Sequence, residues 1–384
     1  MTQLSYWESS TYFNRPDVVI IGAGLIGLCT GISLLEKDPD LNVLILERHY
    51  LPLGASTKNA GFACFGSPSE LLDDLRQHDE AAVFSLFKRR WMGVKKLMKY
   101  VADAPIDWQQ SGGYEVIHSD WSDIQVSQSE LNQLNQNIAD YTGLQNYFYF
   151  DDARLISFGL ERFQRLVANQ HEALLHPVKL WQALLQLFTE SGGRVLFGAA
   201  IKEWQELDSS VRILLRDDTA FHARKLIFCV NGFARRYFPE LQVQAARTLV
   251  LYLHSKREVK LQGCFHLDRG FYYFRNAPGG LIVGGGRQHD LDRENTDEFG
   301  VNDRIRRHLL QVVETHILGH REFSVEQEWT GILGMGPEKK PIIQMCGPHT
   351  AVAVRMGGMG IAIGSLVGEE AAELLYQQLR SSRS

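Results

Sequence analysis

Residues 17–47 read DVVIIGAGLIGLCTGISLLEKDPDLNVLILE. The run VVII predicts a buried β-strand, the segment after the glycines predicts an α-helix, and VLILE predicts a second buried strand. In a G-x-G-x-x-G pattern the first glycine permits a tight turn, the second lets backbone approach a pyrophosphate, and the third lets the helix pack on the strand. Phosphate binds at the helix N-terminus, and an acid about twenty residues further on accepts ribose hydroxyls. The stretch therefore predicts a βαβ unit whose dinucleotide site comprises Gly22, Ala23, Gly24, Ile26, Gly27, Glu47 and Arg48. The alternative is a βαβ unit with only a structural role.

The bulk composition is typical of a globular enzyme. At 384 residues the chain is long enough for two domains. Forty basic and 45 acidic residues give a net charge of −5, which predicts no nucleic-acid partner. The five cysteines are scattered and never form C-x-x-C, which favours reduced thiols and predicts no metal site. Residues 1–16 lack the pattern of a signal peptide and no apolar run is long enough to span a membrane, so we expect a cytoplasmic protein.

The segment 53–66, LGASTKNAGFACFG, favours FAD over NAD as the dinucleotide. An NAD-binding fold normally continues to a third strand, whereas a flavin enzyme must lead a loop past the ribityl chain and the flavin ring. Ser56 and Thr57 have hydroxyls for phosphate or ribityl oxygens, and Ala60 and Gly61 leave room for backbone at the ring edge. A plain surface loop rich in small residues remains the alternative for this segment.

These motifs resemble the D-amino-acid-oxidase-like FAD flavoproteins, which include glycine oxidase, sarcosine oxidase and γ-glutamylputrescine oxidase. The resemblance rests on GAGLIG, LERHYLPLGASTKNAG, HPVKLWQALL (176–185), KLIFCVNGFA (225–234), YYFRNAPGGLIVGGG (272–286), WTGILGMGPEKKPII (329–343) and AVAVRMGGMGIAIGSLVGEEAAELL (351–375). It implies non-covalent FAD that is also contacted by Ala55, Ser56, Thr57, Asn59, Ala60, Gly61, Ile201, Cys229, Val230, Asn231, Gly232, Gly331, Arg355, Met356, Gly357, Gly358, Met359, Gly360 and Ile361.

The same resemblance implies an α/β (α+β) fold, with a Rossmann-like FAD/NAD(P)-binding domain and a discontinuous antiparallel-sheet substrate domain. We expect the FAD-binding domain at residues 1–90, 165–240 and 325–384, and the substrate-binding domain at 91–164 and 241–324. Apolar spacing separately predicts helices over 73–104 and 177–190, and strands over 194–200 and 211–215. Residues 121–146 are rich in Gln, Ser and Asn and resemble an exposed helical insertion.

Three residues are candidates for the catalytic centre. Tyr273 and Arg275 are two residues apart on a predicted strand, so they share one face. The resemblance implies an aromatic wall above the substrate, which we assign to Tyr273, while Arg275 either enters the pocket or caps the strand end. Arg355 precedes the turn MGGMG, whose backbone N–H groups would stabilise the reduced, anionic flavin. Arg355 either adds charge there, meets an acidic substrate group, or forms a surface salt bridge.

Three departures from the resemblance bear on chemistry. Leu333 aligns with the arginine that clamps the substrate carboxylate in glycine oxidase. Either the substrate has no α-carboxylate, or another base holds it, for which Arg355, Arg275 and Lys340 are candidates. Gly331 replaces the cysteine that links flavin in sarcosine oxidases, hence the expectation of non-covalent FAD. Ile282 aligns with their oxygen-activating lysine, so the electron acceptor, O2 or another, is left open.

Taken together, the resemblance implies FAD-dependent oxidation of a C–N bond in a small amine or amino-acid-like substrate by hydride transfer to flavin N5. No His–Asp pair or pair of carboxylates is evident from the sequence for general base catalysis. The alternatives are a 2-hydroxy-acid dehydrogenase on the same scaffold, an NAD-dependent dehydrogenase, and a non-catalytic flavoprotein or subunit of a larger complex. The substrate and the oligomeric state are left open.

Overall fold

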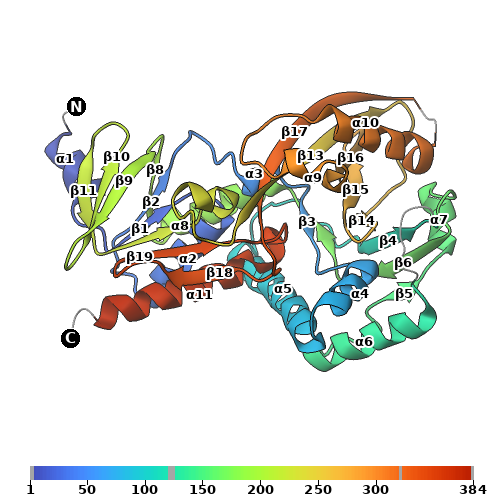
Figure 1. Ribbon diagram of the computed structural model, residues 1–384, viewed down its shortest axis with the longest axis horizontal. Coiled ribbons are helices and arrows are strands. Elements are labelled where there is room, and N and C mark those ends of the chain that lie inside the picture. The colour runs from blue at the N-terminus through green and yellow to red at the C-terminus, as the bar shows by residue number, and fades with distance from the viewer. Residues whose placement is uncertain (1–3, 120–125, 320–321, 382–384) are drawn as a thin grey trace.

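The computed structural model describes residues 4–119, 126–319 and 322–381. Two lobes make up an elongated molecule, and the two ends of the described chain lie at the same far end of the first lobe, on opposite sides of it (Figure 1). The first lobe contains a six-stranded sheet and the second an eight-stranded sheet. This mixed α/β architecture confirms the predicted fold class. None of the described helices is both long and apolar enough to cross a lipid bilayer.

The sheet of the first lobe has the order β18-β19-β12-β1-β2-β8. Its strands are parallel except for β18, which pairs antiparallel with β19 at the edge. Every residue of the four central strands is buried, as is typical of parallel strands covered on both faces. The strands are β1 (Val18–Ile21), β2 (Val43–Glu47), β8 (Arg194–Phe197), β12 (Lys225–Phe228), β18 (Ile342–Met345) and β19 (Thr350–Val354).

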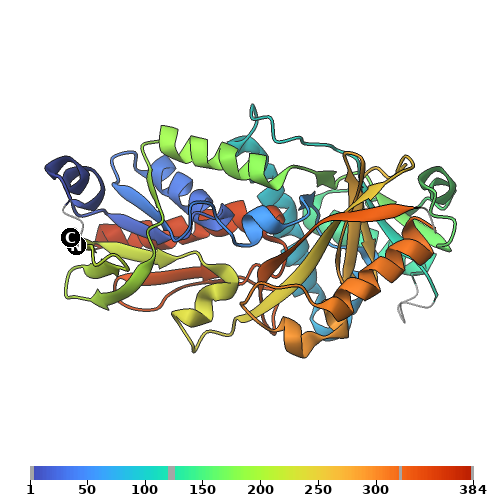
Figure 2. The ribbon, with the colours of Figure 1, turned by 90° about the horizontal axis from the view of Figure 1, so that it is seen from above.

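Helices cover one face of this sheet and a small sheet covers the other. On the first face α2, α8 and α11 pack together, and α5 packs against α11 (Figure 2). On the second face the three-stranded sheet β11-β10-β9 joins a separate apolar core. Their bounds are α2 (Leu25–Lys37), α5 (Glu80–Tyr100), α8 (Pro177–Glu190), α11 (Gly360–Ser381), β9 (Ile201–Glu206), β10 (Val211–Leu215) and β11 (Ala220–Ala223). The predicted βαβ unit, β1–α2–β2, is confirmed.

The sheet of the second lobe has the order β17-β13-β16-β15-β14-β4-β6-β5, and it is antiparallel except for the pair β14 and β4. Helix α10 (Asp303–Val312) packs its apolar residues on one face. The strands are β4 (Gly113–Ile117), β5 (Tyr149–Phe150), β6 (Arg165–Asn169), β13 (Gln244–Ser255), β14 (Cys264–Leu267), β15 (Tyr272–Ala277), β16 (Gly280–Gly285) and β17 (Phe323–Met335).

Shorter elements connect the lobes and cover their edges. The strands β3 (Phe62–Ala63) and β7 (Ala173–Leu174) pair with each other. The remaining α-helices are α1 (Tyr6–Glu8), α3 (Ala55–Lys58), α4 (Pro68–Gln77), α6 (Gln128–Thr142), α7 (Ala153–Phe158) and α9 (Leu291–Glu294).

The local predictions fare unevenly. The helix over 177–190 and the strand over 211–215 are confirmed, while the strand from Arg194 ends at Phe197. The helical structure predicted over 73–104 is confirmed for most of the segment, but it is divided between two helices. Its sequence forms α4 and α5, because the Asp79 side chain accepts from the N–H of Ala82 at 2.7 Å and so begins a new helix. The insertion over 121–146 contains α6, whose apolar side is buried rather than exposed; residues 121–125 lie outside the described residues.

The predicted domain boundaries differ in places from the membership of the two sheets. Strands β6 and β17 are hydrogen-bonded within the eight-stranded sheet, although most of their residues fall in the predicted FAD-binding domain. Helix α5, half of which falls in the predicted substrate domain, packs against α11. The domain division itself stays a prediction.

The contact of α5 with α11 generates a prediction about stability. Alanine is ordinarily better than glycine inside a helix by about 1 kcal/mol. At Gly93, however, a Cβ would collide with the backbone oxygen of Ala362 in the first turn of α11. We therefore expect Gly93→Ala to lower the free energy of unfolding by about 1–3 kcal/mol, measured by urea denaturation.

The control is Met92→Ala on the exposed side of the same helix, where the side chain is 45% exposed. It should change stability by about 0.5 kcal/mol or less. A Gly93→Ala protein as stable as the parent would show that the two helices do not meet in this way.

Candidate active site

A cavity of about 530 Å³ is lined by residues from both lobes. Gly22, Glu47 and Met356 line it from the first lobe, and Thr248 and Tyr273 line it from the second. The glycine turn and the predicted substrate wall thus open on the same space. The groups that line each end of this cavity indicate which kind of ligand can bind there.

The glycine turn brings α2 close to β1 and leaves its own backbone accessible. Gly22 has φ +106°, and a Cβ there would lie 3.0 Å from the backbone oxygen of Cys229. A Cβ on Gly27 would collide with the oxygen of Gly22, so only glycine lets the helix pack this tightly. By contrast, a Cβ on Gly54 or Gly357 would meet nothing within 4 Å. These two positions leave space beside backbone, as a ligand that touches main chain requires.

Glu47 stands at the end of β2 and is 6% exposed. Its Oε2 accepts from the N–H of Ala23 at 3.1 Å, and its Oε1 accepts from the N–H of His49 at 3.1 Å. The carboxylate is therefore fixed beside the glycine turn and lines the cavity. A fixed carboxylate in this position can accept from the hydroxyls of a ribose.

The loop between β2 and β3 is held in shape by its own side chains. Asn59 donates to the carbonyls of Ala55 and Ser56 at 2.9 Å and accepts from the N–H of Gly61 at 2.8 Å. The Ser56 hydroxyl accepts from the N–H of Leu25 at 2.9 Å, which places it at the start of α2. Thr57 instead donates to the carbonyl of Pro52. Ser56 can therefore reach a phosphate group, whereas Thr57 supports the loop.

The turn after β19 points the start of α11 at the cavity. Its amides are partly used within the protein, since Met356 donates to Asn231 Oδ1 at 3.2 Å and Gly357 donates to the carbonyl of Gly334 at 3.0 Å. The first residues of α11, Gly360 and Ile361, line the cavity. The N–H groups of a first helical turn have no acceptor within the helix, and they carry its partial positive charge. Negative charge is therefore favoured at this edge of the cavity.

Most of the residues predicted to bind the cofactor line this one cavity. They are Gly22, Gly24, Ile26, Glu47, Arg48, Ala55, Ser56, Asn59, Ala60, Ile201, Cys229, Val230, Asn231, Gly331, Met356, Gly357, Gly358, Met359, Gly360 and Ile361. Five others lie behind the lining, namely Ala23, Gly27, Thr57, Gly61 and Gly232. They shape it through close packing and hydrogen bonds, as when Ala23 accepts from the Trp181 side chain at 2.8 Å.

A family model described as "FAD dependent oxidoreductase" (DAO) matches residues 17–374. This chain belongs to that family of FAD-dependent oxidoreductases. Over 385 residues it is 20% identical to the probable oxidoreductase OrdL of Haemophilus influenzae, covering 95% of this chain and 84% of that protein. It is 23% identical over 232 residues to the L-2-hydroxyglutarate dehydrogenase of Escherichia coli, covering 57% of this chain and 48% of that protein. The match thus spans about half of that dehydrogenase's length.

Solved structures show the same fold over almost the whole chain. The L-proline dehydrogenase from P. horikoshii has a TM-score of 0.74 and 14% identity, with 94% of each chain covered. The glycine oxidase from Geobacillus kaustophilus has a TM-score of 0.73 and 16% identity, with 94% of this chain and 95% of that chain covered. At these identities the likeness establishes the fold alone.

The residues present fit the FAD of this oxidoreductase family. The positive start of α2 and the glycine backbone suit a diphosphate, and Glu47 suits a ribose. The start of α11 suits the ring edge that becomes negative on reduction. The open positions at Gly54 and Gly357 leave room along the cavity wall. The fit comes from this chain's own geometry and agrees with the FAD dependence of the family.

Aromatic residues form the other end of the oxidoreductase's cavity. The ring of Phe62 meets the rings of Tyr273 and His266 edge-on, with centroid distances of 5.9 and 5.6 Å. Tyr273 lies over Gly284, where a Cβ would be 2.5 Å from its ring. Tyr273 therefore lines this end of the cavity, and its role as a wall above the substrate stays a prediction.

A histidine and a glutamate form a buried pair beside this wall. His266 Nε2 lies 2.9 Å from Glu172 Oε2, and the two residues are 8% and 0% exposed. Burial alone would lower the pKa of His266, but the charge and hydrogen bond of Glu172 outweigh it and raise that pKa above its usual 6.5. His266 lines the cavity, so its ring can exchange a proton with a bound molecule.

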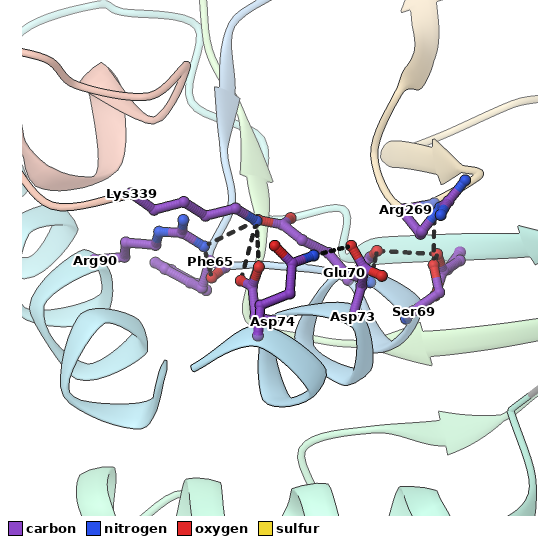
Figure 3. A network of polar contacts seen from close by, with 11 residues as sticks. Phe65, Ser69, Glu70, Asp73, Asp74, Arg90, Arg269 and Lys339 are labelled. Atoms are coloured by element: carbon purple, nitrogen blue, oxygen red, sulfur yellow. Dashed lines mark hydrogen bonds and ion pairs between the residues drawn. The ribbon is translucent and has the colours of Figure 1, made fainter. Parts of the chain in front are cut away.

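An ion network closes the cavity on the side of α4 (Figure 3). Lys339, from the segment after β17, donates to Glu70 Oε1 at 2.9 Å and to Asp74 Oδ2 at 3.0 Å. Arg90 donates to the carbonyl of Phe65 at 2.8 Å and lies 3.5 Å from Glu70 Oε1. Burial would raise the pKa of Glu70, yet Lys339 and Arg90 together lower it to about 2. The network therefore ties the C-terminal part of the chain to α4 across the cavity wall.

Two of the three predicted catalytic residues turn away from the cavity. Arg275 donates to the carbonyls of Ala60 and Leu175 at 3.0 Å and does not line the cavity. Arg355, at φ +68°, donates to the carbonyls of Lys340 and Gln242 at 2.8 and 3.2 Å. Both guanidiniums serve to hold backbone segments together, and we leave them out of the proposed substrate site.

The residues discussed as departures are placed as follows. Leu333 and Gly331 line the cavity, so the positions that hold a clamp arginine or a linking cysteine elsewhere are part of this site. Ile282 is half-buried in β16 and does not line the cavity. Lys340 is exposed, whereas its neighbour Lys339 reaches the cavity.

Several polar residues that line the cavity were not predicted from the sequence, among them Glu70, His266, Arg269, Arg287 and Lys339. One of them had a local signal. The segments 264–267 and 272–277 form a short hairpin in which His266 stands opposite Tyr273. Pairing these two segments would have placed His266 beside the predicted wall. The partners of Lys339 and His266 are far away in the sequence and left no such signal.

The first prediction from the site concerns Glu47. Replacing it by glutamine keeps its size but removes the charge that strengthens hydrogen bonds from a ribose, and such bonds contribute about 1.5–3 kcal/mol. We expect Glu47→Gln to weaken FAD binding roughly 10- to 100-fold, measured by titrating apoprotein with FAD. The exposed Glu203→Gln variant is the control and should bind FAD as the parent does. Unchanged affinity in Glu47→Gln would place the adenosine elsewhere.

The second concerns Lys339. Lys339→Met removes the cation that contacts Asp74 and leaves Glu70 with Arg90 alone. Because the Lys339 side chain is 37% exposed, we expect a loss of only about 1–2 kcal/mol in unfolding free energy. The low folded pKa of Glu70 contributes stability above its usual 4.5, and this contribution is lost as pH falls towards 2. The variant, with a higher Glu70 pKa, should lose stability at higher pH than the parent. Urea unfolding between pH 3 and 7 measures both effects, and Lys340→Met, which removes an exposed amine, should match the parent.

Proposed function

We propose that this chain oxidises the C–N bond of a small amine or amino-acid-like substrate, with FAD as the hydride acceptor. The observation that carries this proposal is the continuity of one cavity from Glu47 and the glycine turn to Tyr273 and His266. A molecule bound against the aromatic wall would share the space with the ring of a cofactor bound at the turn. The names of two structural neighbours, L-proline dehydrogenase and glycine oxidase, support an amino-acid-like substrate.

The cofactor, when bound, supplies the acceptor for a hydride from the carbon beside the substrate nitrogen. This chain's residues then have two tasks. Tyr273 and Phe62 provide an apolar wall that excludes water from the reacting C–H bond. The start of α11 stabilises the negative charge that reduction creates. The substrate becomes an imine, and water hydrolyses it to a carbonyl compound and ammonia or a smaller amine.

FAD is proposed to bind without a covalent link, because Gly331 has no side chain that can bond to it. The electron acceptor is O2 or another oxidant. An amine that binds unprotonated needs no protein base, since the nitrogen lone pair drives the hydride out.

A second candidate is a 2-hydroxy-acid dehydrogenase, and the His266–Glu172 pair favours it. A hydroxyl group must lose its proton as its C–H bond breaks, so a base within the cavity is required. His266, held by Glu172 at 2.9 Å, is a suitable proton acceptor. The name of the Escherichia coli relative, L-2-hydroxyglutarate dehydrogenase, agrees with this candidate.

Anaerobic titration of the FAD-loaded protein distinguishes these functions. Amines, amino acids and 2-hydroxy acids are added in turn, and loss of the oxidised flavin absorbance reports reduction. Bleaching by amino acids or amines supports the first function, and bleaching by hydroxy acids alone supports the second. A protein that stays yellow with every compound would point to a non-catalytic flavoprotein, and a colourless protein that binds NADH would overturn both.

The pH dependence of reduction and the variant His266→Gln separate the two mechanisms further. With an amine the rate should rise as the substrate amine loses its proton, and His266→Gln should retain most of it. With a hydroxy acid the rate should rise as His266 loses its proton, at a pH above the usual 6.5 because its pKa is raised. In that case His266→Gln should lower the rate by about 100-fold or more. Rapid-reaction absorbance measurements give these rates, and a rate independent of pH would contradict both.

A further inference from the structure

Arg287 stands at the end of the strand beside the aromatic wall. Strand β16 pairs with β15 so that Gly284 is opposite Tyr273 and Gly285 is opposite Tyr272. Gly286, at φ +76°, then turns the chain, and Arg287 begins a short 3-10 turn. Gly285 and Arg287 both line the cavity. The arginine therefore stands at the substrate end.

The charge of Arg287 has no partner among the residues that the structure describes. Its Nη1 is buried and makes no hydrogen bond with any of them. Burial lowers the pKa of Arg287, and the charge of Glu294 offsets this only in part. Glu294 is itself held by Arg247 at 2.8 Å and by Asn302 at 3.0 Å. Glu294, whose negative charge acts on Arg287, thus already forms hydrogen bonds with other residues.

Another cation of the cavity differs in this respect. Lys339 is neutralised by Glu70 and Asp74. Arg287 is only partly buried, but burying its Nη1 without a counter-charge is costly, and this cost falls when a ligand brings a negative group. A carboxylate is the matching group, because its two oxygens accept from a guanidinium in parallel.

We infer that Arg287 binds a carboxylate of the substrate, in place of the arginine that Leu333 does not provide. The inference deepens the proposed function and rests on it for the identity of the site as a substrate site. It makes the substrate a small carboxylic acid and predicts that simple amines bind poorly. Arg287 acts here as a specificity residue, because it touches the acid group rather than the reacting carbon.

The test compares acids with matched compounds that lack the acid, in the FAD-loaded protein and in Arg287→Met and Arg287→Lys. Glycine, β-alanine, 4-aminobutyrate and L-proline are set against methylamine, ethylamine, propylamine and pyrrolidine as anaerobic reductants. The parent should prefer at least one acid over its matched amine by about 10- to 100-fold in the concentration that gives half-maximal reduction. Arg287→Met should lose this preference, and Arg287→Lys should retain part of it. Arg293→Met, at an exposed arginine nearby, should behave as the parent.

Two further measurements test carboxylate binding by Arg287 even if no compound reduces the flavin. Cyclopentanecarboxylate has the acid but no C–N bond, and cyclopentanecarboxamide is its uncharged match. Only the carboxylate should raise the melting temperature of the parent, and it should not raise that of Arg287→Met. In the absence of ligand, Arg287→Met should be as stable as the parent or more so, whereas an arginine with a structural role would leave the variant less stable.

The outcomes separate the two proposals. Carboxylate binding that depends on Arg287 without any reduction would retain the inference and overturn the proposed oxidation. Reduction by amino acids with an unchanged acid preference in Arg287→Met would retain the function and overturn the inference. Reduction by simple amines as readily as by acids, or no carboxylate binding to the parent, would also overturn it.

Discussion

The close approach of α2 to the turn after β1 is the constraint on which the rest of the site depends. It exists because Gly27 has no side chain to collide with the oxygen of Gly22. The same device recurs outward from this contact. Gly368 of α11 lies against Cys29 of α2, where a Cβ would be 2.5 Å from the cysteine Cβ, and Gly93 of α5 lies against the backbone of α11. Tight packing transmits position from one helix to the next, because close-packed interiors do not deform freely. The starts of α2 and α11 are therefore both directed at one cavity.

As a result, the two ends of the cavity differ in their electrostatic character. Two helix N-termini make the cofactor end favourable for negative charge, and Glu47 is the fixed exception that suits sugar hydroxyls. At the other end the protein's charges are mostly satisfied internally. Lys339 is paired with Glu70 and Asp74, and His266 is paired with Glu172. Paired groups shape the wall without demanding a ligand, whereas Arg287 lacks such a partner among the described residues.

Local sequence patterns and the family resemblance predicted the features whose residues lie close together in the sequence. The βαβ unit and the lining positions of Glu47 and Tyr273 all follow from residues within one motif or one strand. Arg275 shows the limit of strand periodicity, because it shares a strand with Tyr273 as predicted but its long side chain ends on the carbonyls of Ala60 and Leu175. The pairs His266–Glu172 and Lys339–Glu70 join residues 94 and 269 positions apart, so only tertiary packing brings them together. The break between α4 and α5 was readable in principle from Asp79, but apolar spacing alone runs through it.

The position of Arg287 relative to Leu333 bears on how a substrate would lie. Leu333 belongs to β17 and Arg287 follows β16, and β13 separates these two strands in the sheet. Since neighbouring strands are about 4.8 Å apart, the two backbones lie roughly 10 Å apart across the sheet. Along β13, Leu333 pairs with Ala246 and Gly285 pairs with Leu249, three residues or about 10 Å further on. The long side chain of Arg287 can span part of the distance to Leu333. No described residue hydrogen-bonds its Nη1. A carboxylate bound there is therefore displaced sideways from the position that an arginine at 333 would impose. Under the proposed function the reacting carbon lies between Tyr273 and the cofactor. The distance from that carbon to the acid group is then the quantity by which the site would select its substrate.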